Sequence, residues 1–483
     1  MDRTIYDNYV KILRKELVPA LGCTEPIALA YASAKAREVL GEFPEHMTVW
    51  CSGNIIKNVK GVKVPNSGGM KGVEAAAVLG LAGGDPSQAL EVLEAVTQTD
   101  IKRTKELLRE SFCDCCLKEG VANLYIEVQV VNGENEATVI IEQEHTNITR
   151  IEKNGKIVYA HKKEVSGEEI EVDKSLLNLA DILVFAQEVD LNEVRDVLAR
   201  QIRYNSRIAK EGLEHEWGAQ VGRVIAEEFG TTVQWKAVAS AAAGSDARMS
   251  GCSLPVIINS GSGNQGMTCS LPVIEYGKEL KKSEEEIYRA LCVSNLVALN
   301  QKRYIGSLSA YCGAVCAAAG AGAGITYLCG GNLEQIQNTV VNTIADAGGI
   351  VCDGAKPSCA AKIATSLQAA ILSHKMAMRG LVFGSGEGLV MDCPEDTIKA
   401  VGYVGRAGMK QTDVEILNLM IGKTKIEDIE KYIRKMYPQV FRKIVTACKK
   451  GLIFVSKRKA DETFQKEIRS NECKAVQNSR KAG

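Results

Sequence analysis

A run of alternating residues in the N-terminal half constrains the fold more than any other feature. From Asn123 to Lys162, apolar and polar residues alternate, and Asn132-Gly133 and Asn154-Gly155 interrupt the pattern. Such alternation is typical of half-buried strands, and Asn-Gly is a strong signal for a tight hairpin turn. We therefore expect antiparallel hairpins across the region 122–162.

From about Lys174 onward the pattern changes to helical spacing in an alanine-rich chain. We expect glycine loops to interrupt these helices at 259–266, 312–324, 348–354 and 384–388. Residues 1–45 also have helical spacing, whereas Met47–Gly69 alternates like strands broken by glycine. The fold class expected is α+β, with a strand-containing N-terminal part and a mainly helical, Gly/Ala-rich C-terminal catalytic part.

A chain of 483 residues is long enough for two or three domains. We expect an N-terminal α+β domain at 1–173, a helical domain at 174–420 and a basic C-terminal extension at 421–483. The extension holds 17 Lys or Arg against 7 Asp or Glu, but it has few aromatic residues for base stacking. A solvated tail is the favoured interpretation, and no nucleic-acid partner is expected.

The N-terminus has acidic residues and no uninterrupted apolar core, so a signal peptide is not expected. The stretch Ile305–Gln335 carries few charges, but it is made mainly of small residues, which favours a buried helix over a membrane span. We expect a cytoplasmic protein that binds no membrane. In that setting most of the 16 cysteines are expected to be buried and reduced.

Three cysteines lie in glycine-bearing segments: Cys312, Cys352 and Cys359. They match no zinc signature, because no C-x2-C pair or histidine partner accompanies them. Three thiolates on a four-iron cluster would leave one iron without a protein ligand, free to act as a Lewis acid. Structural cysteines are the alternative that spacing alone leaves open.

Two loops share the theme of an apolar or proline residue, Asn-Ser-Gly and further glycine, at 65–72 and 258–269. Such loops can present backbone amides and hydroxyls to a carboxylate, although tight turns would explain them equally well. Cys23 comes just before a helix with Pro26 in its first turn, where the helix dipole would favour a thiolate; an inert thiol is the alternative. None of the five histidines lies at metal-ligand spacing with another, and we expect them to be structural.

Five ordered segments resemble the L-cysteine desulfidase family, which is related to the iron–sulfur L-serine dehydratases, particularly their alpha-chain region. The segments are VPALGCTEP, CSGNIIKNVKGVKVPNSGG, NSGSGNQG, YCGAVC and GGIVCDGAKPSCAAKI. The resemblance covers roughly residues 5–420 and stops before the basic extension. The fold expected from it is that of a serine dehydratase alpha chain.

The resemblance implies a [4Fe-4S] cluster on Cys312, Cys352 and Cys359. It implies α,β-elimination of L-cysteine to pyruvate, ammonia and hydrogen sulfide, with Cys23 as the catalytic base. The GCTEP form, in place of the dehydratases' histidine-containing motif, favours cysteine over serine. The residues expected to bind the amino-acid substrate are Asn66, Ser67, Gly68, Gly69, Ser260, Ser262, Gly263, Asn264 and Gln265.

Other interpretations stay open. An L-serine dehydratase of the same superfamily would use the same site. A pyridoxal-phosphate lyase would need a Schiff-base lysine, for which Lys71 and Lys356 are the candidates. A non-catalytic cluster- or zinc-binding protein would explain the cysteines but not the Asn-Ser-Gly loops. We expect a homodimer.

Overall fold

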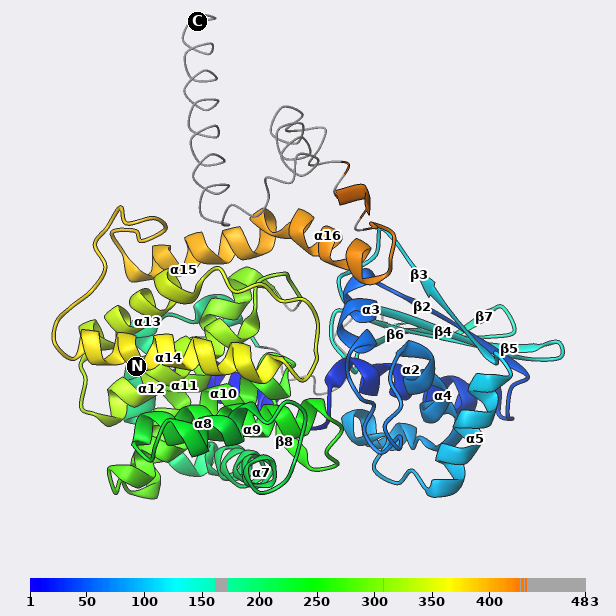
Figure 1. Ribbon diagram of the computed structural model, residues 1–483, viewed down its shortest axis with the longest axis horizontal. Helices are drawn as coiled ribbons and strands as arrows, with labels where there is room; N and C mark the ends of the chain where they lie inside the picture. Colours follow the sequence, from blue (N-terminus) through cyan, green and yellow to red (C-terminus); the bar gives the residue numbers. More distant parts are fainter. Residues whose placement is uncertain (161–171, 307, 426, 430, 432–483) are drawn as a thin grey trace, which may run out of the picture. The chain divides into compact units, whose positions relative to one another are not determined.

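The computed structural model of the chain describes residues 1–160, 172–306, 308–425, 427–429 and 431. It has the predicted α+β architecture, with a sheet in the N-terminal part and helices beyond it (Figure 1). The helices are α1 (Arg3–Glu16), α2 (Thr24–Leu40), α3 (Gly53–Lys60), α4 (Val73–Gly83), α5 (Gln98–Arg109), α6 (Leu179–Glu188), α7 (Arg195–Glu214), α8 (Val221–Glu228), α9 (Val233–Met249), α10 (Gly263–Glu279), α11 (Glu284–Ile305), α12 (Gly313–Leu328), α13 (Leu333–Ala347), α14 (Cys359–Ala377), α15 (Pro394–Tyr403) and α16 (Lys410–Met420).

The strands are β1 (Pro19–Leu21), β2 (His46–Cys51), β3 (Cys113–Leu117), β4 (Tyr125–Asn132), β5 (Asn135–Glu142), β6 (Ile148–Lys153), β7 (Lys156–Ala160) and β8 (Pro255–Ile257). Short single-turn segments are η1 (Pro86–Glu91), η2 (Lys174–Leu176), η3 (Leu191–Glu193) and η4 (Val404–Gly408). Six strands form one sheet in the order β3-β2-β4-β5-β6-β7, in which only β2 and β3 are parallel. The short strands β1 and β8 pair with each other.

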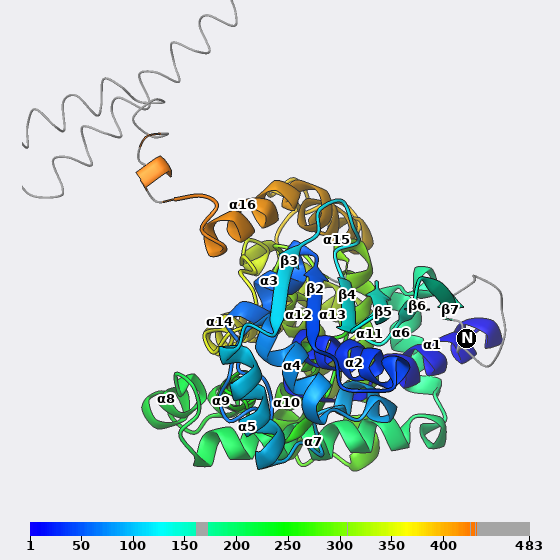
Figure 2. The same ribbon diagram turned by 90° about the vertical axis from the view of Figure 1, so that its right-hand side faces the viewer.

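The predicted hairpins are confirmed, and their register follows the hydrophobic alternation. Val128 on β4 lies between Val49 on β2 and Val139 on β5, and all three are buried on one face. Helix α2 covers that face (Figures 1 and 2). Asn154 and Gly155 form the β6–β7 turn as expected, both with positive φ. In the other hairpin the turn lies one residue later, because Asn132 is still paired with Asn135.

Two apolar cores form. The sheet core contains buried residues between Leu21 and Ile151, from α2, α4 and the sheet. The helical core contains buried residues from α1 and from elements between Leu177 and Val401. Helix α1 thus belongs to the helical core although the sheet follows it in sequence.

By its internal contacts the chain divides into Met1–Leu417 and Asn418–Gly483. The boundary at 173/174 stays a prediction. Most of the predicted extension 421–483 lies outside the described residues. None of the described helices has both the length and the apolar character that a membrane-spanning helix needs.

Two local expectations are wrong. Of Met47–Gly69, only the beginning is a strand, because Ser52 caps a helix that starts at Gly53: its hydroxyl accepts a hydrogen bond from the Ile55 N–H at 3.4 Å.

The expected glycine loop at 312–324 is helix α12. Its glycines serve close helix packing rather than turning. A Cβ on Gly320 would lie 2.4 Å from the carbonyl oxygen of Ser294 on α11.

Gly320→Ala is therefore expected to lower the free energy of unfolding by about 1–3 kcal/mol, because the added methyl group overpacks the α11–α12 contact. Urea unfolding followed by circular dichroism measures this. Gly408→Ala is the matched control, since its Cβ would have no neighbour closer than 3.5 Å. Equal stability of the two variants would contradict the packing role of Gly320.

A buried histidine in α14 links stability to pH. His374 lies 2.9 Å (Nδ1) from the Thr326 hydroxyl, and burial, with Lys375 beside it, lowers its pKa from 6.5 to about 4. Between these values the unfolded chain binds a proton that the folded protein does not. The contribution of neutral His374 to the free energy of unfolding is therefore complete above pH 6.5. It falls by up to about 3 kcal/mol as the pH decreases to 4. His374→Gln should show a smaller acid loss of stability in pH-dependent urea unfolding; an acid loss equal to that of the unmodified protein would contradict this linkage.

Candidate active site

The residue predicted to be the base, Cys23, occupies the N-cap of α2. It is buried, and its thiol donates a hydrogen bond to Glu25 Oε2 at 3.0 Å. Burial raises the pKa of Cys23 well above its usual value, and the Glu25 carboxylate raises it further. The expectation that the helix dipole leaves Cys23 as a thiolate is therefore not met in this state. The thiol keeps its proton and shares it with Glu25.

Glu25 is buried and held from several sides. Asn58 Nδ2 donates to Oε1 at 2.9 Å, and the Thr24 hydroxyl oxygen lies 3.3 Å from Oε2. Burial works against its charge, but nearby His145, the Cys23 thiol and Arg248 outweigh burial and hold the pKa of Glu25 below its ordinary value. Glu25 is thus held as a carboxylate, and it accepts the hydrogen bond of the Cys23 thiol.

Cys23, Glu25, Asn58, His145 and Arg248 together form what we call the Glu25 centre. Three of them carry a buried polar atom with no hydrogen-bond partner among the described residues: Asn58 Oδ1, His145 Nε2 and Arg248 Nε. Burial is also the main reason that the pKa of His145 is lowered. Buried polar atoms are rarely left without partners. Their concentration here indicates a place for a polar ligand.

The three predicted cluster ligands lie close to one another. Cys312 is the N-cap of α12 and Cys359 is the first residue of α14. Cys352 lies between α13 and α14, where its N–H donates to Ala310 O at 2.6 Å. We call these cysteines the thiol triad. Cys359 also packs into a small apolar cluster with Cys23, which brings the Glu25 centre next to the thiol triad.

The electrostatics around the thiol triad favour negative charge. A hydrogen bond from Cys312 lowers the pKa of Cys352 to about 5, and the same bond raises the pKa of Cys312. Two buried cations, Lys57 and Lys302, act on Cys352 in the same direction. Lys57 forms an ion pair with Asp413, whereas no described carboxylate lies within ion-pair distance of Lys302.

These residues fit a [4Fe-4S] cluster in their chemistry. Thiolates are the usual cluster ligands, and buried cations and helix N-termini compensate the cluster's negative charge. Among the described residues, no three His, Cys, Asp or Glu side chains are arranged to hold a single metal ion. Cluster ligands each bind a different iron, so they need not surround one point. The hydrogen bond between Cys312 and Cys352 would be replaced by iron–sulfur bonds.

The predicted loop 260–265 borders the Glu25 centre. Ser262 is the N-cap of α10, and Gly263, Asn264 and Gln265 form its first turn. The Thr24 hydroxyl donates to Gly261 O at 2.9 Å, and Arg248 Nη1 donates to Asn264 Oδ1 at 3.1 Å.

The same loop also reaches the thiol triad. Gly313 follows Cys312 directly. A Cβ on Gly313 would lie only 2.7–2.9 Å from the side-chain amide atoms of Gln265. The structure therefore places this loop between the Glu25 centre and the thiol triad.

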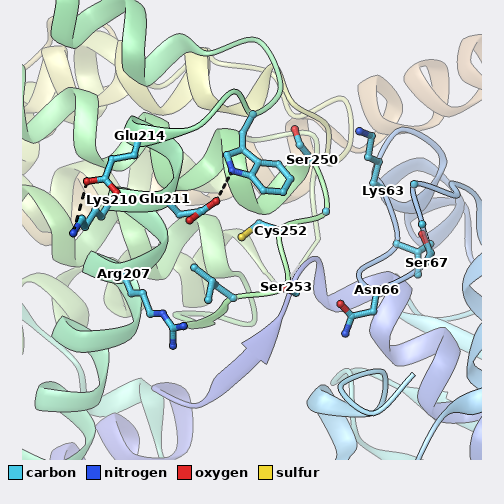
Figure 3. A pocket seen from close by; sticks show the side chains of 16 residues that line it. Lys63, Asn66, Ser67, Arg207, Lys210, Glu211, Glu214, Ser250, Cys252 and Ser253 are labelled. Atoms are coloured by element: carbon cyan, nitrogen blue, oxygen red, sulfur yellow. Dashed lines mark hydrogen bonds and ion pairs between the residues drawn. The ribbon is translucent and has the colours of Figure 1, made fainter. Parts of the chain in front are cut away.

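The other predicted loop, Asn66–Gly69, faces a different space. It lines a cavity of about 680 Å³ together with the C-terminal half of α7 and residues 250–254 (Figure 3). Figure 3 shows Asn66 and Ser67 on one side and Arg207, Lys210, Glu211 and Glu214 on the other.

Only one layer separates this cavity from Cys23. Val62 and Met249 pack against Cys23, while the next residues along the chain, Lys63 and Ser250, line the cavity. Asn66–Gly69 and residues 260–265 therefore border different spaces, and in the described part of the chain no hydrogen bond joins them.

Four site residues were missed in the sequence: Glu25, Asn58, His145 and Arg248. Arg248 carried a usable signal, because it and Asp246 are the only charged residues in Ala237–Met249, an otherwise small or apolar helical run. His145 carried no such signal in the sequence, since it lies in the β5–β6 connection. Folding brings its ring close to Gly261, so that a Cβ on Gly261 would lie 3.2 Å from the ring.

Fold and site together define a class of α+β proteins in which four helices, α2, α10, α12 and α14, begin around one buried, thiol-lined centre. A family model described as serine dehydratase alpha chain matches residues 87–418. The chain belongs to that family, whose members are typically iron–sulfur-dependent lyases.

Bacterial relatives match over most of the chain, and three of them carry the name UPF0597 protein. The relative from Lachnoclostridium phytofermentans is 54% identical over 417 residues, covering 86% of this chain and 100% of the relative. The one from Finegoldia magna is 50% identical over 417 residues, with the same coverages. The one from Desulfitobacterium hafniense is 49% identical over 418 residues, covering 86% of this chain and 97% of the relative.

Proposed function

We propose that this protein is an iron–sulfur-dependent L-cysteine desulfidase. It would eliminate sulfide from L-cysteine and yield pyruvate, ammonia and hydrogen sulfide. The observation that carries this proposal is the packing of Cys359, one of the thiol triad, against the cluster that contains Cys23, beside unsatisfied polar atoms. Membership of a lyase family supports it independently.

Cys312, Cys352 and Cys359 would hold a [4Fe-4S] cluster, with one iron left without a protein ligand. Bound there, the cluster would supply Lewis acidity for the departing sulfur. Lys57 and Lys302 would compensate its negative charge, each buried close to Cys352.

The proton chemistry would belong to Cys23 and Glu25. Cys23, once it has lost its proton to solvent, would take the proton from the substrate Cα, and the thiol so formed would donate to the Glu25 carboxylate as it does at 3.0 Å in this state. The Cα–H and Cβ–S bonds break, and sulfur leaves with the electron pair as sulfide. General-base catalysis of this kind contributes about 10²- to 10⁴-fold.

The remaining steps need only water. Elimination leaves 2-aminoacrylate, which tautomerises to the imine and takes up one water to give pyruvate and ammonia. Ser260, Ser262, Gly263, Asn264 and Gln265, beside the Glu25 centre, would hold the substrate's carboxylate and amino groups. Asn66, Ser67, Gly68 and Gly69 line the neighbouring cavity, and their part in substrate binding stays a prediction. Val62 and Met249 would keep bulk water from Cys23, since both are fully buried.

Anaerobic reconstitution with iron and sulfide tests the proposal. Iron and acid-labile sulfide are counted per chain, and pyruvate and sulfide are measured with L-cysteine and with L-serine. About four irons with sulfide release from L-cysteine support the desulfidase. Turnover of L-serine alone would assign the L-serine dehydratase reaction instead. Iron without turnover of either amino acid would contradict the proposal.

A further inference from the structure

The most deeply buried cation of the Glu25 centre has no anionic partner. Arg248, near the end of α9, is 2% exposed. In the described part of the chain no carboxylate lies within 4 Å of its guanidinium. Its Nη1 donates to the neutral amide of Asn264, and its Nε has no acceptor. Burying a guanidinium without a counter-charge is strongly unfavourable. The site is therefore expected to receive an anion.

Glu25 is not that anion. Its Oε1 accepts from Asn58, and its Oε2 accepts from Cys23. Its negative charge acts on Arg248 at a distance, but its oxygens accept hydrogen bonds from other side chains. Arg248 thus keeps donor capacity that no described residue uses.

A second set of donors lies against the same guanidinium. Gly263 opens α10, and a Cβ there would be 2.4 Å from Arg248 Nε, so only glycine lets the helix start approach this closely. The first bond at this helix start runs from Gly266 N–H to Ser262 O, and the Ser262 side chain makes no cap. The N–H groups of Gly263, Asn264 and Gln265 therefore have no acceptor within the helix, the situation in which helix N-termini bind anions.

We propose that Arg248 binds the α-carboxylate of the amino-acid substrate, with the N–H groups at the start of α10 as further donors. The planar guanidinium fork matches a carboxylate in two parallel hydrogen bonds. The position suits the reaction, because Met249, the next residue, packs against Cys23. A carboxylate held by Arg248 would keep Cα close to Cys23. This inference rests on the proposed function, but its test does not require turnover.

The experiment compares equilibrium binding of L-alanine and L-alaninamide to the reconstituted holoprotein by calorimetry. L-Alanine has no β-leaving group, so it binds without reacting, and the amide differs only in lacking the carboxylate charge. The unmodified protein should prefer L-alanine by about 10²-fold, since removing one partner of a buried charge pair has an effect of this order. Arg248→Lys keeps the charge but loses the fork, and should reduce the preference to less than about 10-fold.

Two further variants keep the test decisive. Asn264→Asp is nearly isosteric and offers Arg248 an internal carboxylate, so it should reduce the preference for L-alanine even if Arg248→Lys fails to fold. Arg223→Lys is the matched control, because Arg223 pairs with Glu227 and has no hydrogen bond or ion pair to a residue of the Glu25 centre among the described residues; its preference should equal that of the unmodified protein.

The outcomes separate the two proposals. An unchanged preference in both Arg248→Lys and Asn264→Asp, with L-cysteine still eliminated by the unmodified protein, would overturn the role of Arg248 and leave the proposed function standing. An Arg248-dependent preference in a protein that releases no sulfide or pyruvate would support carboxylate binding and overturn the desulfidase. An unmodified protein with no preference between the two probes would overturn the role of Arg248 directly.

Discussion

Cys359→Ala is expected to lose its iron on desalting and to release pyruvate no faster than the uncatalysed reaction. Cys359 is the first residue of α14, a position that accepts alanine readily, so the variant should fold. The loss would follow from removing one of three thiolates, since a cluster held by two is weakly bound and has lost its place beside Cys23. Iron and acid-labile sulfide per chain, measured before and after desalting, give the result.

Cys316→Ala provides the matched control for that experiment. Cys316 lies one turn beyond Cys312 on α12, is equally buried, and is not assigned to the cluster. It should retain iron and turnover. Loss of iron from Cys316→Ala, with iron retained by Cys359→Ala, would show that the wrong cysteines were assigned.

Cys23→Ala is expected to lower turnover by about 10²- to 10⁴-fold while iron content stays unchanged. The substitution removes the group that takes the Cα proton but leaves the thiol triad intact. Glu25→Gln should lower turnover in the same direction, because the Cys23 thiol would lose the carboxylate that accepts its hydrogen bond. Steady-state pyruvate formation by iron-matched samples measures both effects.

Cys51→Ala controls for loss of a buried thiol in the same part of the chain, because Cys51 is fully buried in β2 and distant in role from the site. It should turn over normally. Turnover of Cys23→Ala within a few-fold of the unmodified rate, at equal iron content, would rule out Cys23 as the base.

The sheet could be predicted in detail because its signals are local. The hairpins of β4 to β7 follow from alternation and Asn-Gly turns, and the strand register follows once one face is buried. The helical part could be predicted only as a class. The glycines of α12 were read as loop residues, since a glycine that permits a turn and one that permits two helices to touch look the same in sequence.

The site divides in the same way. Cys312, Cys352, Cys359 and Cys23 stand out in the sequence because they lie in glycine-bearing segments or before a helix, and their roles stay predictions. Glu25, His145 and Arg248 have meaning only through contacts between segments far apart in the chain. The protonation of Cys23 was also beyond reach, since it depends on burial and on Glu25 rather than on the helix end.

Cys23 and Lys57 come from α2 and α3, at the edge of the sheet core, whereas the thiol triad comes from the helical core. Whatever occupies the site therefore links elements of the two cores. By linkage, occupancy adds its binding free energy to the stability of that junction. The backbone amides of α3 should then exchange with deuterium more slowly in the iron-loaded protein than in the iron-free one, while those of β5 should be indifferent.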